Sequence, residues 1–169
     1  TELLKANSVA TFVVDGSTYA IVTAGANLGD DGVQLIDVSE PSTPLAVSSA
    51  QDGVDSFMLD GPRGVATFVI GSSTYAIVAC VTDHVVQIID VSDPSALVAV
   101  GSATDGTGGF NTLRSPYDVA TFVIGASTYA IVSSVTDNGV QLIDVSDPST
   151  PVAVGEATDG GDFSLSSSR

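Results

Sequence analysis

Aspartates are the side chains of this sequence best suited to chemistry, because they recur in the segments that separate its apolar runs. The recurring loop aspartates are Asp52, Asp105, Asp159, Asp83 and Asp137. Carboxylates gathered with backbone carbonyls suit Ca²⁺, a hard cation that takes about six to eight oxygen ligands. No spacing matches an EF-hand loop, and Asp-Gly and Asp-Asn pairs also form ordinary turns that keep a surface soluble. The same segments therefore predict either a calcium site, to which Asp30 and Asp31 would add ligands, or a structural set of turns.

A thiol and an imidazole stand close together in the sequence, at Cys80 and His84. A Cys-His pair works only where the two side chains converge, and here Cys80 is expected to end a strand while His84 lies in the loop after it. In a second, nearly identical stretch the corresponding residues are Ser134 and Asn138. Chemistry at this pair would exist once and without a visible partner, so we expect no catalytic residue and no enzyme.

Two further sets of residues recur at fixed positions of the predicted strands. The aspartates inside the repeated Ile-Asp-Val-Ser are Asp37, Asp90 and Asp144. An Asp at the end of a strand can accept hydrogen bonds from backbone donors of the turn, which favours a structural role. The repeated tyrosines are Tyr19, Tyr75 and Tyr129, and their strand position predicts packing between neighbouring sheets. Tyr117, in a predicted long loop, is a better platform for stacking on a sugar.

The charge of the chain excludes several classes of partner. Twenty acidic residues against four basic ones give a formal net charge of −16, which repels nucleic acid and anionic membranes. No apolar run approaches the roughly 20 residues of a membrane helix, and the single cysteine permits no disulfide within the chain. We therefore expect no nucleic-acid partner and no membrane insertion, and we keep cations, sugars and protein surfaces as partners.

Internal repeats dominate the sequence. Residues 65–106 and 119–160 align without a gap and differ at only nine positions, which implies duplication. A third, earlier copy carries a short insertion around residues 26–29, where a loop is expected. The chain therefore divides into repeats at 1–56, 57–109 and 110–169, of which the last includes the start of a further connection.

Each repeat predicts four short β-strands. A β-rich run, a Gly-containing turn and a second β-rich run predict a hairpin, and two more runs follow, separated by Ser-Asp-Pro or its equivalent. In the first copy the predicted strands are 9–14, 18–24, 33–38 and 45–50. The runs are apolar on both faces, so each sheet should be covered on both sides by its neighbours. Four antiparallel strands in roughly 40 to 50 residues are the size of a β-propeller blade, so we predict an all-β chain of three tandem blades.

The repeated motif resembles a known family. The order Tyr-Ala-x-Val, Val-Gln-Leu-Ile-Asp-Val-Ser-Asp-Pro and Val-Ala-Val-Gly is similar to the LVIVD repeat, and the stretch Ile143 to Pro148 matches it closely. Copy one departs at Glu40, and copy two departs at Ala96 and Leu97. The resemblance implies a propeller architecture and the extracytoplasmic setting of bacterial and archaeal surface proteins. It implies no particular chemistry.

Three blades are too few to close a propeller, which takes about four to eight. We expect the missing blades to come from self-association into a ring or filament, or from adjacent repeats of a longer chain. The function that we expect is a non-enzymatic scaffold outside the cell or on its surface, in a surface layer, adhesin or fibre. The alternative is a module that binds Ca²⁺ or carbohydrate on the acidic loop face, with no other cofactor.

Overall fold

The computed structural model describes residues 5–25, 31–160 and 164, and these form three four-stranded antiparallel sheets. The first sheet, blade 1, consists of β1 (Ala6–Val14), β2 (Ser17–Ala24), β3 (Gly32–Asp37) and β4 (Leu45–Gln51). Blade 2 consists of β5 (Pro62–Ile70), β6 (Ser73–Cys80), β7 (Val85–Asp90) and β8 (Val98–Thr104). Blade 3 consists of β9 (Pro116–Ile124), β10 (Ser127–Ser134), β11 (Gly139–Asp144) and β12 (Val152–Thr158). The predicted all-β class and the four-stranded repeat are confirmed, and none of the described residues forms a helix that could cross a membrane.

The turn between the first two strands of each blade explains why glycine recurs there. In blade 1 both central residues, Asp15 and Gly16, have positive φ angles (50° and 81°), and in blades 2 and 3 the first central residue is Gly71 (62°) or Gly125 (63°). Two-residue hairpin turns need such angles because their twist matches that of the flanking strands. The predicted hairpins are confirmed, although the first strand begins at Ala6 rather than at residue 9, beyond an irregularity in its pairing.

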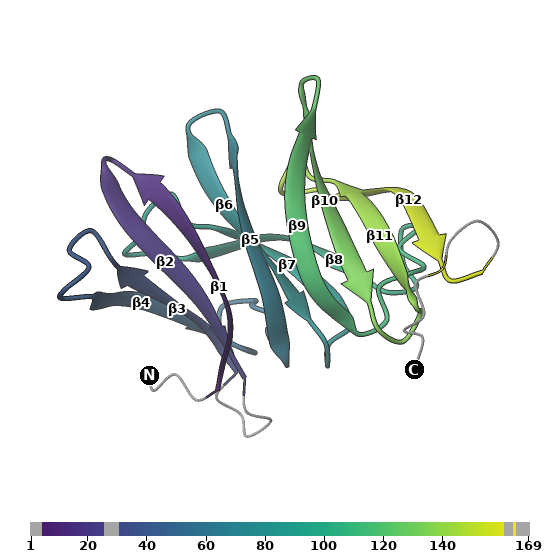
Figure 1. The fold of residues 1–169 in the computed structure, drawn as a ribbon, viewed down its shortest axis with the longest axis horizontal. Helices are drawn as coiled ribbons and strands as arrows, with labels where there is room; N and C mark the ends of the chain where they lie inside the picture. The colour runs from purple at the N-terminus through teal and green to yellow at the C-terminus, as the bar shows by residue number, and fades with distance from the viewer. Residues whose placement is uncertain (1–4, 26–30, 161–163, 165–169) are drawn as a thin grey trace.

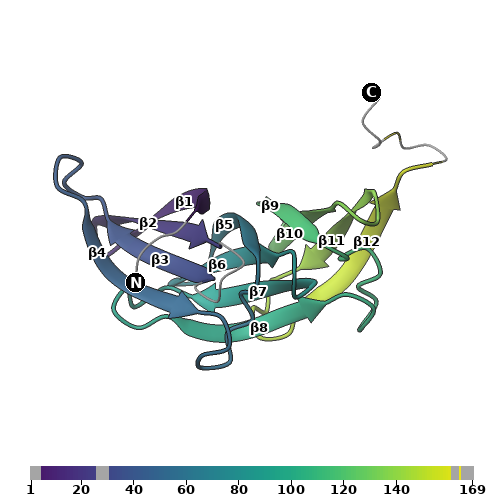
Figure 2. The ribbon, with the colours of Figure 1, turned by 90° about the horizontal axis from the view of Figure 1, so that it is seen from below.

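The blades stand side by side with their first strands together. Strands β1, β5 and β9 are neighbours, and the fourth strands β4, β8 and β12 spread away from them (Figures 1 and 2). A ladder of threonines ties the first strands to one another. The Thr67 hydroxyl donates to the carbonyl of Thr11 (3.2 Å), and the Thr121 hydroxyl donates to the carbonyl of Thr67 (3.0 Å). Each later blade therefore donates to the one before it.

The core lies between the blades. One apolar cluster joins blade 1 to blade 2, and a second joins blade 2 to blade 3. Phe57 and Leu59, from the connection between β4 and β5, are buried in the first cluster, and Phe110 and Leu113 are their equivalents in the second. The connecting loops thus take part in the core.

A buried glutamine in the third strand fixes each of the last two blades to the connection that precedes it. The Gln87 amide donates to the carbonyl of Gly101 (2.7 Å), and its side-chain oxygen accepts the N–H of Met58 (3.3 Å). Gln141 repeats both bonds in blade 3, with Gly155 (2.8 Å) and Thr112 (3.2 Å). Each glutamine side chain thus pairs with a backbone carbonyl of the fourth strand and with a backbone N–H of the preceding connection. Buried polar groups require such hydrogen-bond partners.

Candidate functional site

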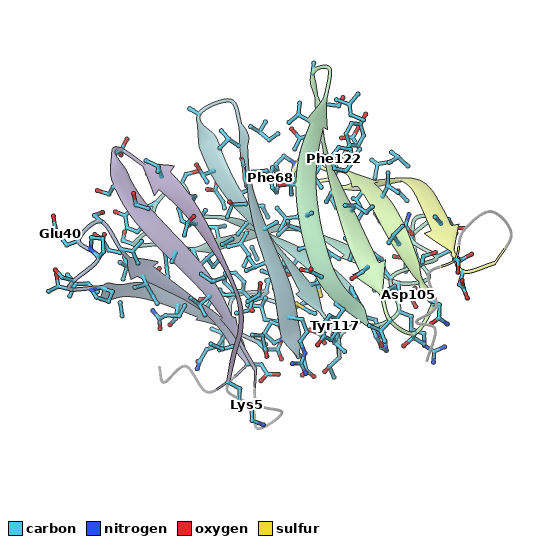
Figure 3. The ribbon with its side chains drawn as sticks, viewed as in Figure 1. Lys5, Glu40, Phe68, Asp105, Tyr117 and Phe122 are labelled. Carbon is cyan, nitrogen blue, oxygen red and sulfur yellow. The ribbon has the colours of Figure 1, made fainter. Side chains whose placement is uncertain are left out.

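The acidic loops lie at one end of the blades, where each connection between blades meets the loop between the second and third strands. Lys5, Asp105 and Tyr117 lie toward this loop end, and Phe68 and Phe122 lie toward the opposite end (Figure 3). Asp52 accepts the N–H of Leu59 (2.7 Å). The equivalent Asp105 accepts the N–H of Leu113 at 3.4 Å. Each carboxylate thus accepts a hydrogen bond from the backbone of a leucine, Leu59 or Leu113, that is buried in the core.

The second set of loop carboxylates holds the same connections from the other side. The Asp83 carboxylate accepts the N–H of Asp60 (3.0 Å), and the Asp137 carboxylate accepts the N–H of Arg114 (2.8 Å). In blade 3, Asp159 donates its own N–H to the carbonyl of Asn138 (2.8 Å). The candidate ligands Asp83 and Asp137 therefore accept backbone hydrogen bonds in the described structure.

One position of these loops has a role that the sequence did not reveal. Asp31 is buried and accepts the N–H of Gly61 (2.8 Å), and the equivalent His84 accepts the N–H of Ser115 through Nδ1 (3.0 Å). A histidine that accepts at Nδ1 carries its proton on Nε2 when it is neutral. Asn138 holds the same position in blade 3. The signal was present in the alignment of Asp, His and Asn, because all three side chains can accept a hydrogen bond.

Cys80 and His84 make separate contacts, because the imidazole accepts the N–H of Ser115 (3.0 Å) and the Cys80 thiol donates to the carbonyl of Val78 (3.8 Å). The thiol is buried in the cluster between blades 1 and 2, and burial, followed by the charge of Asp83 and its neighbours, raises the pKa of the thiol well above its usual range. A protonated thiol is a poor nucleophile. The polar side chains of this region accept hydrogen bonds from backbone N–H groups of the connections between blades.

Four carboxylates gather where blades 1 and 2 meet at the loop end: Asp31, Asp52, Asp60 and Asp83. Burial raises the pKa of Asp60, and a hydrogen bond with Asp31 and the charges of the other three add to the shift. No group of three or more His, Cys, Asp or Glu side chains is arranged to hold a metal ion within residues 5–25, 31–160 and 164. Asp30, the other predicted ligand, lies outside the described residues. The calcium site stays a prediction.

We expect Asp60→Asn to raise the melting temperature at pH 7. A carboxyl whose pKa is raised in the folded chain keeps its proton while the unfolded chain loses one, so stability falls as the pH rises from about 4 through the raised value. The amide removes that loss, and the difference between variant and parent should vanish below pH 4. Melting curves from pH 3 to 8 measure it, with Asp55→Asn in the same connection as the control. A melting temperature of Asp60→Asn at or below that of the parent at pH 7 would contradict this expectation.

The repeated strand residues occupy equivalent places in all three blades. The Asp37 carboxylate accepts the N–H of Ser39 (2.8 Å), and Asp90 and Asp144 do the same with Ser92 (2.8 Å) and Ser146 (2.9 Å). Hydrogen bonds from Ser39 lower the pKa of Asp37. The tyrosines stack on the phenylalanine of the first strand, in the pairs Phe12–Tyr19, Phe68–Tyr75 and Phe122–Tyr129, with ring centroids 5.5 to 5.8 Å apart.

Tyr117 lies beside a cavity of about 230 Å³ among the first strands, at the loop end. The cavity is lined by Asn7, Ser8, Arg63, Gly64, Tyr117 and Asp118. The Arg63 guanidinium lies over the tyrosine ring, 5.8 Å from its centroid, and donates to the side-chain oxygen of Asn7 (3.0 Å). Tyr117 is half exposed (50 %), but a cation occupies one region of its ring face. Sugar stacking on it stays a prediction.

Among residues 5–25, 31–160 and 164, an apolar sheet face is left uncovered at both ends of the row of blades. We call the face of a blade that points to the next blade its forward face, and the opposite one its rear face. On the rear face of blade 1, Val9 is 60 % exposed, whereas the equivalent Val65 and Val119 are 6 % and 7 % exposed because another blade covers them. On the forward face of blade 3, Ile131 is half-buried, whereas the equivalent Ile77 is fully buried.

The forward face of blade 3 is also hollowed. A second cavity of about 230 Å³ is lined by Asp118, Val119, Ala120, Ile131, Ser133 and Val140. At the equivalent place on blade 2, Ile77 and Val86 pack in one cluster with Val119 of blade 3. An exposed apolar face is therefore the most developed feature at both ends of the described structure.

Comparison with known families identifies the repeat. A family model described as the LVIVD repeat matches residues 27–52, 64–105 and 128–159, which together make up more than half of the chain. No curated protein matches the sequence. The predicted resemblance is confirmed, and the three matches fall in the three blades.

Proposed function

Because this chain belongs to the LVIVD repeat family, whose repeats are of the β-propeller type, we propose that it is a non-enzymatic scaffold protein that assembles through its blade faces. The observation that carries the proposal is the pair of uncovered apolar faces. Large apolar patches mark association sites because their exposure to water is costly. Propeller blades bury both faces against neighbours, and here the end blades each lack one neighbour among the described residues.

The loop end supports a scaffold more than an active site. Asp52, Asp83 and His84 all accept backbone hydrogen bonds that hold the connections between blades, and Cys80 is buried. An active site needs groups that converge on a substrate. The same side chains serve structure in successive blades, which is typical of a repeat architecture.

We place the protein outside the cell or on its surface, in a surface layer, an adhesin or a fibre. The strongly acidic surface supports this setting because it resists nonspecific association with anionic cell components. Antibody labelling of intact host cells tests it. Label that appears only after the cells are permeabilised would contradict an extracellular location.

The mass and shape of the native assembly test the proposed association. We expect light scattering to give a multiple of the chain mass of 16.9 kDa and negative-stain images to show rings or fibres. A single-chain mass at all concentrations would contradict the proposal. If assembly required Ca²⁺, and if replacing Asp105 and Asp159 by Ala abolished calcium binding, the ligand-binding alternative would replace it.

A further inference from the structure

The interface between blades 2 and 3 is a template for what can cover the two ends. Its first half is the forward face of blade 2: Phe68, Tyr75, Ile77, Val86, Ile88 and Ala103. Its second half is the rear face of blade 3: Val119, Ala130, Val132, Ile143, Val145 and Ala153. Together with Phe110 and Leu113, these residues form one cluster that excludes water. Any surface that repeats the two halves can form the same interface.

The end faces repeat both halves almost residue for residue. The forward face of blade 3 carries Phe122, Tyr129, Ile131, Val140, Leu142 and Ala157, which differs from blade 2 only by Leu142 in place of Ile88. The rear face of blade 1 carries Val9, Ala20, Val22, Ile36, Val38 and Ala46, which is identical to blade 3 at every one of these positions. The two uncovered faces are thus complementary to each other by the same packing that the chain already uses.

We propose that a second copy of this chain covers both ends, so that two chains close one ring of six blades. The inference rests on the proposed self-association and specifies its partner. Blade 3 of each chain packs its forward face on the rear face of blade 1 of the other chain. The cavity on blade 3 then receives Val9 of the second copy, as Val119 packs with Ile77 and Val86 inside one chain.

Polar groups at the ends continue the pattern of the interior. Inside the chain, the threonine of each later blade donates to the threonine carbonyl of the blade before it. At the new junction, the Thr11 hydroxyl donates to the Thr121 carbonyl of the other chain. Asp31 and His84 accept the N–H of Gly61 and Ser115, and in the same way the Asn138 side chain accepts the N–H of Lys5 of the other chain. Lys5 has the positive φ (57°) of those two partners (66° and 60°).

A small residue in the fourth strand marks the close approach of each blade to the next. A Cβ atom on Gly101 would collide with the carbonyl of Pro148 in the next blade, and the hydroxyl of the equivalent Ser48 in blade 1 donates to the carbonyl of Pro94 (2.7 Å). For the equivalent Gly155 of blade 3, no atom of the described residues lies within 4 Å of the Cβ position. At the junction it meets the carbonyl of Pro41 from the second copy. Gly155 is thus suited to a neighbour that the described part of the chain does not supply.

The number of chains follows from the number of blades. Closed propellers have about four to eight blades, and copies of this three-blade sequence add blades in threes. Only six falls within that range, so a ring built from these blades alone has two copies. The first strands lie together on one side of the molecule while the fourth strands spread around the opposite side, so the side of the first strands is open to a second half (Figure 2). Two-fold symmetry makes the two junctions identical.

The first test is Gly155→Val. In the single chain the new side chain enters open space in a strand where any residue is allowed, but at both junctions it collides with Pro41. We expect two-chain particles to become single chains, with about a 100-fold weaker association and an unchanged circular dichroism spectrum. Val152→Ala, on the same strand and at a position exposed in every blade, is the control. A Gly155→Val variant that associates as tightly as its parent would overturn the junction.

A cross-link distinguishes a ring from a filament. A Cβ atom on Gly64 would lie 2.6 Å from the Cα of Asp118 in the next blade, so the equivalent Ser8 and Asp118 face each other across the junction. Their Cα atoms would then lie closer than the roughly 4.4 to 6.8 Å that a disulfide spans, so a short bifunctional thiol reagent is the suitable cross-linker. We expect Ser8→Cys/Asp118→Cys treated with this reagent to give a two-chain band and nothing longer. A ladder of longer products would overturn the ring but keep the proposed assembly, and single chains alone would overturn both.

Discussion

Replacing Gln87 by Leu is expected to lower the free energy of unfolding by about 3 kcal/mol. The Gln87 side chain is 1 % exposed and donates to the Gly101 carbonyl while it accepts the Met58 N–H. Leucine has a similar volume but no polar atoms. Both backbone groups would lose their partner in a place with little access to water, and each unsatisfied group costs about 1 to 3 kcal/mol. Urea unfolding at pH 7, followed by circular dichroism, measures the loss.

The repeat provides a replicate and a control for this variant. Gln141→Leu breaks the equivalent bonds to Gly155 and Thr112 and should cost a similar amount. Gln51→Leu makes the same exchange at the half-buried end of β4, for which the described residues show no side-chain hydrogen bond. It should change the free energy by less than about 0.5 kcal/mol. If Gln87→Leu were equally harmless, water would be satisfying Gly101 and Met58, and the glutamine would not be holding the connection.

The sequence predicted the strands well because their signal is local and repeated. The alternation in Ala-Thr-Phe-Val and Tyr-Ala-Ile-Val places Phe68 and Ile77 on one face and Ala76 and Val78 on the other, and both faces are buried in blade 2. Glycine turns then set the pairing of neighbouring strands. Duplication helped further, since an uncertain strand in one copy is supported by the same strand in another. The start of β1 was missed because irregular pairing follows no simple period.

The buried glutamines could not be predicted from the sequence. In Val-Gln-Ile-Ile, alternation suggests that Gln87 lies on a wetter face than its neighbours, yet it is almost fully buried. It lies there because its two partners are backbone atoms of Gly101 and Met58, and backbone partners leave no trace in residue types. His84 is similar, since its role as an acceptor depends on where Ser115 lies. The loop carboxylates were singled out for their charge, and the structure shows what their oxygens accept.

The largest contrast is expected between two equivalent isoleucines. Ile77→Ala should destabilise the chain by about 3 kcal/mol, because the side chain is fully buried between blades 2 and 3 and its loss leaves a cavity. Ile131→Ala removes the same atoms from the half-buried end face and should cost only about 1 kcal/mol in a single chain. The Gly155→Val background is expected to keep the protein as single chains, so urea unfolding in that background measures the two effects without a partner.

Ring formation should remove this contrast. In the proposed ring the partner's blade 1 covers Ile131 as blade 3 covers Ile77, so the side chain should be worth about 3 kcal/mol there as well. About 1 kcal/mol of this is already lost in the single chain, and the remaining about 2 kcal/mol at each of the two junctions should appear as weaker association of the two chains. Sedimentation of Ile131→Ala at a series of concentrations measures that weakening. Val123→Ala, at a position that is exposed in all three blades, is the control. Association of Ile131→Ala as tight as that of the parent would mean that the forward face of blade 3 stays uncovered in solution, because only a covering partner can turn a half-buried side chain into a core one.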